Sequence, residues 1–205
     1  MKKVTILSAF VLFASLVSAQ FVRLEVEEVP NDGLVPGKTY RVYAVMTNQN
    51  DVIDAVFADK TSSIQINSTA PIYQHPKGGF FANTVQRMDV SQDRKLKYDS
   101  WFTIGAEDNY NNYLTPFMLD SSYMKTFEAG KSFTIAGDGA WFVTPDQRQA
   151  RADAKGRILL MQITTKGKVT GTLNIHGRTA DTKDAQGNQV PGTPFEKRGV
   201  QITIG

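Results

Sequence analysis

The chain has 205 residues, no cysteine, and 23 lysine and arginine side chains against 20 aspartates and glutamates, which gives a formal net charge of +3. This near balance, with no basic stripe interleaved with aromatics, does not predict a nucleic-acid partner. The lack of cysteine excludes disulfides and a thiol nucleophile. A chain of this length can bury a sizeable hydrophobic core without disulfide bonds.

Residues 1–19 have the pattern of a secretory signal peptide. Lys2 and Lys3 form a basic start, residues 4–16 an apolar run and residues 17–19 a small-residue end, which predicts cleavage between Ala19 and Gln20. The alternative is an uncleaved anchor, but the apolar run is shorter than the roughly 20 residues that span a bilayer. We therefore expect a secreted protein, extracellular, periplasmic or at the cell surface, with no transmembrane segment in the mature chain.

The predicted mature chain is nearly neutral, since removal of Lys2 and Lys3 from the 23 basic residues leaves 21 against 20 acidic ones. A secreted chain without cysteine is more typical of bacteria than of animals, so we expect a bacterial source.

Period-two patterning dominates the mature sequence. Val22, Leu24 and Val26 alternate with charged residues, as in a strand with one apolar face that packs on the core. Further candidate strands are 40–46, 52–58, 63–67, 80–84, 100–105, 132–135, 140–143, 158–165, 168–176 and 200–204. Because turn residues separate these runs, we predict an all-β fold: a single antiparallel β-sandwich of about ten strands over 20–205.

One helix is expected near 145–154. Thr144 can cap it, Pro145 suits its first position and Gln147 stands at the capping-box position. Arg148 and Arg151 would share one face, which we interpret as solvated surface. The polar segment 181–194 is expected to be an exposed loop.

Each tryptophan is followed by a phenylalanine, at Trp101 and at Trp141. Adjacent residues of a strand point to opposite faces, so each pair places an aromatic ring on both sides of its sheet. The simplest interpretation is packing on both faces. The alternatives are one tryptophan exposed as a stacking platform for sugar rings, or a weak internal duplication.

The loop 107–113 is the best candidate for a recognition surface, because tyrosine and asparagine are typical of binding loops. Tyr110 and Tyr113 are its candidate ligand-binding residues. An ordinary loop whose tyrosines cover a sheet edge is the alternative. Glu107, Asp108 and Asn109 are oxygen donors and candidate calcium ligands, although their spacing matches no established calcium loop.

Catalytic motifs are scarce. His75 and His176 do not belong to a metal-binding spacing, and no G-x-S-x-G run occurs. A glycosidase needs only two carboxylates brought together by the fold, which leaves a glycan-active enzyme open. We expect no catalytic residue and no cofactor, with structural calcium as the alternative.

The run DGAWFVTPDQ at 138–147, followed by the segments 157–165 and 171–175, resembles an uncharacterised secreted all-β domain of bacterial surface and extracellular proteins, often from marine Bacteroidetes. Residues 40–43, 51–57 and 99–105 are similar to its earlier segments, so the resemblance spans most of 20–205. It implies export but no activity, ligand or catalytic residue.

The leading hypothesis for function is a non-enzymatic extracellular β-sandwich with a structural or adhesive role through protein–protein contacts. Predicted strands at 21–29 and 200–204 could pair with other extracellular proteins or with copies of this chain, because terminal strands can join an exposed sheet edge. The alternative is a carbohydrate-binding module that uses Trp101, Trp141, Tyr110 or Tyr113. A glycan-active enzyme ranks third.

Overall fold

The computed structural model describes residues 21–205. The predicted signal peptide and its cleavage point between Ala19 and Gln20 lie outside the described residues. The first strand, β1 (Phe21–Val29), starts at the first described residue.

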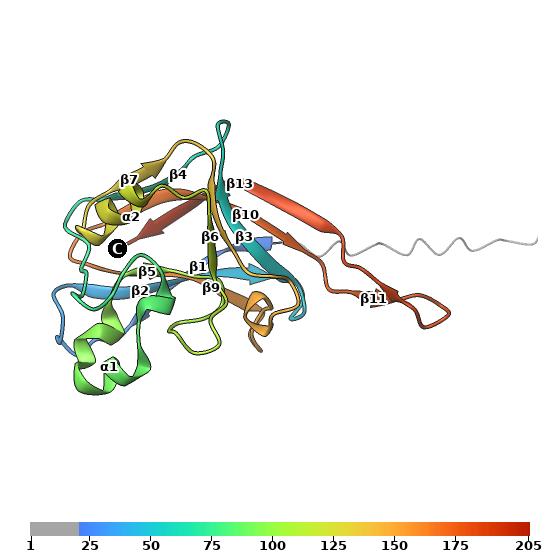
Figure 1. The fold of residues 1–205 in the computed structure, drawn as a ribbon, viewed down its shortest axis with the longest axis horizontal. Helices are drawn as coiled ribbons and strands as arrows, with labels where there is room; N and C mark the ends of the chain where they lie inside the picture. Colours follow the sequence, from blue (N-terminus) through green and yellow to red (C-terminus); the bar gives the residue numbers. More distant parts are fainter. Residues whose placement is uncertain (1–20) are drawn as a thin grey trace, which may run out of the picture.

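The fold is all-β, as predicted, and is built mainly from two antiparallel sheets (Figure 1). The four-stranded sheet has the order β1, β2 (Lys38–Met46), β9 (Arg157–Thr165) and β5 (Trp101–Phe102). The seven-stranded sheet contains β6 (Thr115–Phe117), β8 (Gly139–Phe142), β3 (Val52–Ala58), β10 (Val169–Arg178), β4 (Ile64–Ser68), β7 (Phe133–Ile135) and β13 (Pro194–Ile204).

Strand β10 organises the seven-stranded sheet. Along one edge it pairs with β13, and along the other with β4 over its first half and β3 over its second half. The polar segment expected to be a loop forms the hairpin β11 (Thr182–Lys183) and β12 (Gln189–Val190), which projects from the body of the molecule (Figure 1).

The main core lies between the two sheets and is centred on aromatic rings. The Phe80 and Phe102 rings stack with centroids 4.8 Å apart, and the Trp141 ring lies 5.3 Å from Phe102. Phe127 and Phe133 complete the cluster, each within 5.8 Å of Phe102. Edge-to-face and offset contacts of this kind stabilise beyond the apolar area that they bury.

A second, smaller core covers the outer face of the four-stranded sheet. There Trp101, Tyr43 and Leu159 pack against Val85 and Leu96. The covering chain contains three short helices, η1 (Ala82–Thr84), α1 (Arg87–Gln92) and η2 (Arg94–Tyr98). Trp101 thus faces this outer core while Phe102 faces the main core, so packing on both faces of the sheet is confirmed for this pair.

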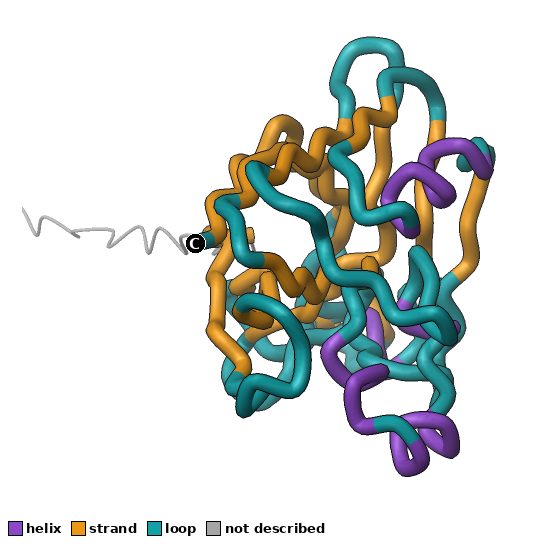
Figure 2. The backbone as a smooth tube through the Cα atoms, turned by 90° about the vertical axis from the view of Figure 1, so that its left-hand side faces the viewer, coloured by secondary structure: helices purple, strands orange, loops and turns teal. Residues whose placement is uncertain are grey.

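The helical content differs in detail from the sequence prediction. Near 145–154 the structure has only a three-residue 3-10 turn, η3 (Arg148–Ala150), because Arg151 is already extended and bridges to Val52. The longer helix α2 (Ser121–Glu128) was not predicted, although Asp120 caps it by accepting from the Ser122 N–H and Phe127 anchors it in the core. In Figure 2 the helical segments lie in the half of the molecule away from the C-terminus.

Candidate functional site

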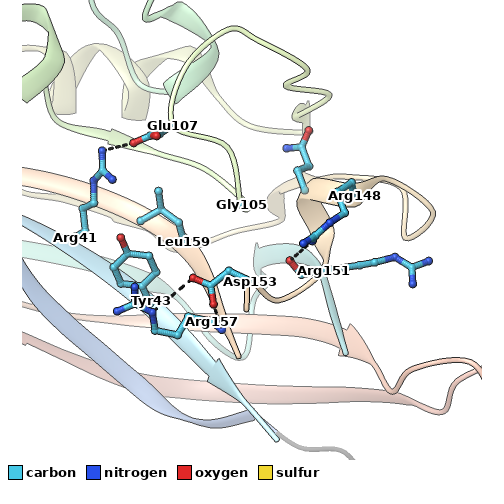
Figure 3. A pocket seen from close by; sticks show the side chains of 10 residues that line it. Arg41, Tyr43, Gly105, Glu107, Arg148, Arg151, Asp153, Arg157 and Leu159 are labelled. Carbon is cyan, nitrogen blue, oxygen red and sulfur yellow. Dashed lines mark hydrogen bonds and ion pairs between the residues drawn. The ribbon is translucent and has the colours of Figure 1, made fainter. Parts of the chain in front are cut away.

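A groove of about 430 Å³ lies on the outer face of the four-stranded sheet, beside the second core. Strands β2 and β9 form its floor, the loop 103–113 one wall and the turn 147–154 the other (Figure 3). The residues that line it are Arg41, Tyr43, Gly105, Glu107, Arg148, Gln149, Arg151, Asp153, Arg157 and Leu159.

Strand alternation places the floor residues on one face. Tyr43 pairs with Leu159 on β9 and with Glu25 on β1. The Arg157 guanidinium lies 4.1 Å from the Tyr43 ring centroid and forms ion pairs with Glu25 at 3.1 Å and Glu27 at 2.8 Å. The hydrogen bond from Arg157 holds the pKa of Glu25 below its ordinary value. The floor is therefore a fixed, charge-compensated surface.

A second hollow of about 450 Å³ adjoins the groove and shares Arg148 and Gln149 with it. We call it the tyrosine basin, because Tyr110 and Tyr113 line it with 59% and 55% of their surface exposed. Its other side-chain groups include guanidinium and amide donors from Arg87, Asn111 and Gln147. Such a surface offers flat apolar rings next to planar hydrogen-bonding groups.

Hydrogen bonds within the loop that carries Tyr110 and Tyr113 fix its conformation. The Asp108 side chain accepts from the Tyr110 N–H at 2.8 Å, and its carbonyl accepts from the Asn112 side chain at 2.9 Å. Asn111 adopts a left-handed conformation with φ of 49°, which asparagine tolerates better than most residues. These local bonds shape the turn between the two tyrosines.

Both flanks of the loop are also anchored. On one side the Arg87 N–H donates to Asn109, and the Arg87 side chain pairs with Asp108 at 2.5 Å and lies 4.2 Å from the Tyr110 ring centroid. On the other side the Tyr113 N–H donates to Gln149 Oε1 at 2.7 Å. A loop held at both ends loses little conformational freedom when it binds a ligand.

Gly105 allows the loop to approach the 3-10 turn closely. Its φ is +75°, and a Cβ there would lie 1.8 Å from the Gln149 carbonyl oxygen. At this junction Gln149 also donates from Nε2 to the Ile104 carbonyl at 2.8 Å. The two walls of the groove therefore meet through backbone contact.

The structure separates the four predicted ligand-binding aromatics. Tyr110 and Tyr113 are exposed in the tyrosine basin, whereas Trp101 and Trp141 have 1% and 0% of their surface exposed. The interpretation of a tryptophan as an exposed stacking platform is therefore wrong. Trp101 is enclosed in the second core on the outer face of the four-stranded sheet, and Trp141 is enclosed in the main core between the sheets.

The three candidate calcium ligands face other partners. Glu107 forms an ion pair with Arg41, Asp108 pairs with Arg87, and Asn109 donates to Gln86. Within residues 21–205 no group of three or more His, Cys, Asp or Glu side chains is close enough to hold a metal ion. Calcium binding at this loop would require Glu107 and Asp108 to leave their arginines.

The two histidines lie elsewhere and each contacts an aspartate. His75 Nε2 is 3.1 Å from Asp93, and His176 Nδ1 is 2.5 Å from Asp54. Backbone N–H groups of the loop around His75 donate to the buried Asp99 carboxylate, at 2.7 Å from His75 and 3.3 Å from Gly79. Burial raises the pKa of Asp99 to about 7, and these N–H groups oppose the rise.

The position of the arginines in the groove was not predicted from the sequence. Arg148 and Arg151, interpreted as solvated surface, line the groove, and Arg41 and Arg157 reach it from β2 and β9. The alternation of Arg41 and Tyr43 with buried Val42 and Ala44 was a signal that these two side chains share an outer face.

Comparisons with models of known protein families, with curated proteins and with solved structures found no match to this chain. The resemblance to a secreted bacterial domain therefore stays a prediction. In the described part of the chain, no helix is both long and apolar enough to cross a membrane.

Proposed function

We propose that this chain is an exported, non-enzymatic binding domain that holds a carbohydrate in the tyrosine basin. The observation that carries the proposal is the exposure of Tyr110 and Tyr113 on a loop that is anchored on both flanks, beside a hollow of about 450 Å³. Export rests on the predicted signal peptide.

The chemistry of the basin suits a sugar. A sugar ring offers an apolar C–H face, which packs on an aromatic side chain, and a rim of hydroxyls. Tyrosine supplies rigid amphipathic area at low entropic cost. Amide and guanidinium groups from Asn111, Gln147 and Arg148 can donate to hydroxyl oxygens around such a ring. A few convergent polar groups next to apolar surface are typical of small-ligand sites.

The test is a glycan array followed by calorimetric titration of the best ligand. We expect Tyr110→Ala and Tyr113→Ala each to weaken binding about tenfold, since each variant removes one stacking surface. Phe117→Ala is the matched control, because Phe117 is 56% exposed but lines neither hollow. Binding that is unchanged in both tyrosine variants, or a wild-type protein that binds no glycan, would reject the proposal.

A second candidate function is the adhesive or structural role through protein contacts. Strand β1 is one edge of its sheet and β13 one edge of the other, and the two strands contact each other across the sandwich. Val22 is 54% exposed and Val26 39% exposed on β1. Long edge strands of this kind can accept a strand from a neighbouring molecule.

Sedimentation over a wide concentration range tests this second candidate. We expect the wild type to form dimers or larger assemblies, and the double variant Val22→Lys/Val26→Lys to remain monomeric because it places charges along the edge. A wild-type protein that stays monomeric at high concentration would remove the candidate.

A further inference from the structure

We propose that the ligand is an extended acidic polysaccharide, which runs from the tyrosine basin through the groove and places successive negative charges at Arg148 and Arg151. This inference rests on the proposed carbohydrate-binding function and specifies the ligand class. Three observations carry it: the continuity of the hollows, the pairing state of the arginines, and the directions of their side chains.

The hollows form one continuous track. The groove shares Arg148 and Gln149 with the tyrosine basin, and it shares Arg148, Arg151 and Asp153 with a third hollow of about 440 Å³. This third hollow is lined by further polar groups from Gln49 and Asn50. Since each hollow has room for a single sugar unit or more, the track suits a chain rather than a compact ligand.

The arginines of the track fall into two classes. Arg87, Arg41 and Arg157 are each ion-paired to carboxylates. Among residues 21–205, neither Arg148 nor Arg151 forms an ion pair. In the described part of the chain, the Arg148 side chain reaches only the carbonyls of Arg151 and Ala152, at 3.5 and 3.4 Å.

The aspartates near Arg148 and Arg151 form no ion pair with either arginine within residues 21–205. Asp153, which lines the groove, accepts from the N–H groups of Lys155 and Arg157 at 2.8 and 2.9 Å. Asp146 and Asp181 interact with Arg151 only at longer range, where Arg178 also acts on them. Two guanidinium groups therefore remain available for anionic groups of a ligand.

The two side chains diverge from opposite ends of the 3-10 turn: Arg148 is its first residue, and Arg151 is the extended residue that follows it. In Figure 3 the Arg148 guanidinium points back to the Arg151 carbonyl, on the side of the other labelled groove residues, while the Arg151 side chain points away from those residues. They are thus placed to meet two charges spaced along a chain rather than to clamp one. Uronate residues of an acidic polysaccharide present carboxylates at such intervals, with hydroxyls between them for the neighbouring amides.

The experiment compares polygalacturonate, alginate and hyaluronate oligomers with the carboxyl-reduced, neutral form of each, by titration calorimetry. For at least one of the three, we expect the acidic form to bind about tenfold or more tightly than its reduced form. Raising the salt concentration should reduce this difference, because exposed charge pairs are screened. Shortening the oligomer from six to two units should also weaken binding at least tenfold.

Arg148→Gln and Arg151→Gln should each weaken binding of the acidic form about tenfold. Both variants should weaken binding of the reduced form much less, because the reduced form has no carboxylate for either guanidinium and loses at most one hydroxyl donor at Arg148. Arg94→Gln is the charge-matched control, since Arg94 is exposed but lines none of the three hollows. Equal binding of acidic and reduced forms, or arginine variants that match the control, would overturn this inference while the carbohydrate-binding proposal stands.

Two other outcomes would overturn the proposed function or the proposed ligand class. If neither form of any oligomer binds, and the glycan array is also empty, both the inference and the proposed function fall. If single-stranded DNA of similar length and charge binds more tightly than every acidic oligomer, and Arg148→Gln and Arg151→Gln weaken that binding, the proposed ligand class is wrong.

Discussion

The backbone N–H of Tyr113 donates a 2.7 Å hydrogen bond to the side chain of Gln149, 36 residues further along the chain. The same glutamine donates from Nε2 to the Ile104 carbonyl at 2.8 Å. One side chain thus holds both ends of the loop segment 104–113 against the 3-10 turn. The positions of the exposed tyrosines therefore depend on Gln149, which need not contact the ligand itself.

Gln149→Ala should loosen this loop. We expect a loss of about 1–2 kcal/mol in the free energy of unfolding, because two hydrogen bonds to the backbone disappear. Glycan affinity should fall mainly through a less favourable binding entropy, since the loop must then be ordered on binding. Urea unfolding and calorimetry measure the two effects. Gln147→Ala is the control for the stability measurement: among the described residues its Nε2 reaches only Asp146, at 3.4 Å, so its loss should leave the free energy of unfolding unchanged.

Gly105→Ala should disrupt the junction between loop and turn. We expect a loss of at least about 2 kcal/mol in unfolding free energy, from the positive φ and from the contact with the Gln149 carbonyl. Gly33→Ala is the matched control: its φ is +70°, but its Cβ would meet nothing within 4 Å, so it should cost only about 1 kcal/mol. Equal losses in the two variants would show that the close approach contributes nothing.

Asp99 should make stability fall as the pH rises. Its folded pKa is raised to about 7 from the ordinary 3.8, so between these values the folded state binds more protons than the unfolded state. The free energy of unfolding therefore receives a contribution that decreases across this interval. Asp99→Asn should remove that contribution, which urea unfolding at a series of pH values measures.

The control for this slope is Asp184→Asn. Asp184 is exposed on the projecting hairpin, and a hydrogen bond from the Asn188 side chain holds its pKa below the ordinary value. Its contribution to stability is lost only as the pH falls through the acidic range. The wild-type slope between about pH 4 and 7 should persist in this variant, and an identical slope in Asp99→Asn would contradict the assignment.

The buried tryptophans should affect stability but not binding. Trp101→Phe and Trp141→Phe are each expected to cost about 1–2 kcal/mol, since each leaves a cavity but also removes an indole N–H that has no hydrogen-bond partner within residues 21–205. Glycan affinity should match the wild type in both variants. Strong quenching of the wild-type fluorescence by acrylamide would show that at least one indole is accessible.

The local pattern of the sequence determined most of the longer strands, but the prediction of a strand at 80–84 is wrong, because this segment contains the 3-10 helix η1. Alternation is a property of adjacent residues, so β2, β3, β9 and β10 lie close to their predicted positions. The same reasoning placed Trp101 and Phe102 on opposite faces. Local composition also indicated the loop 107–113 as a candidate recognition surface, but it left open whether the tyrosines are exposed or cover a sheet edge.

Only the tertiary structure decided which side chains are covered and which charges are compensated. Arg41 forms an ion pair with Glu107, which lies 66 residues away in the sequence. Arg148 and Arg151 have no carboxylate partner within the described residues. The outer face of the four-stranded sheet is buried at Trp101 but open at Arg41, because the helical segment 82–98 covers only part of it. Burial and ion pairing depend on which distant segments the topology brings into contact. The local periodicity of the sequence does not encode these long-range contacts.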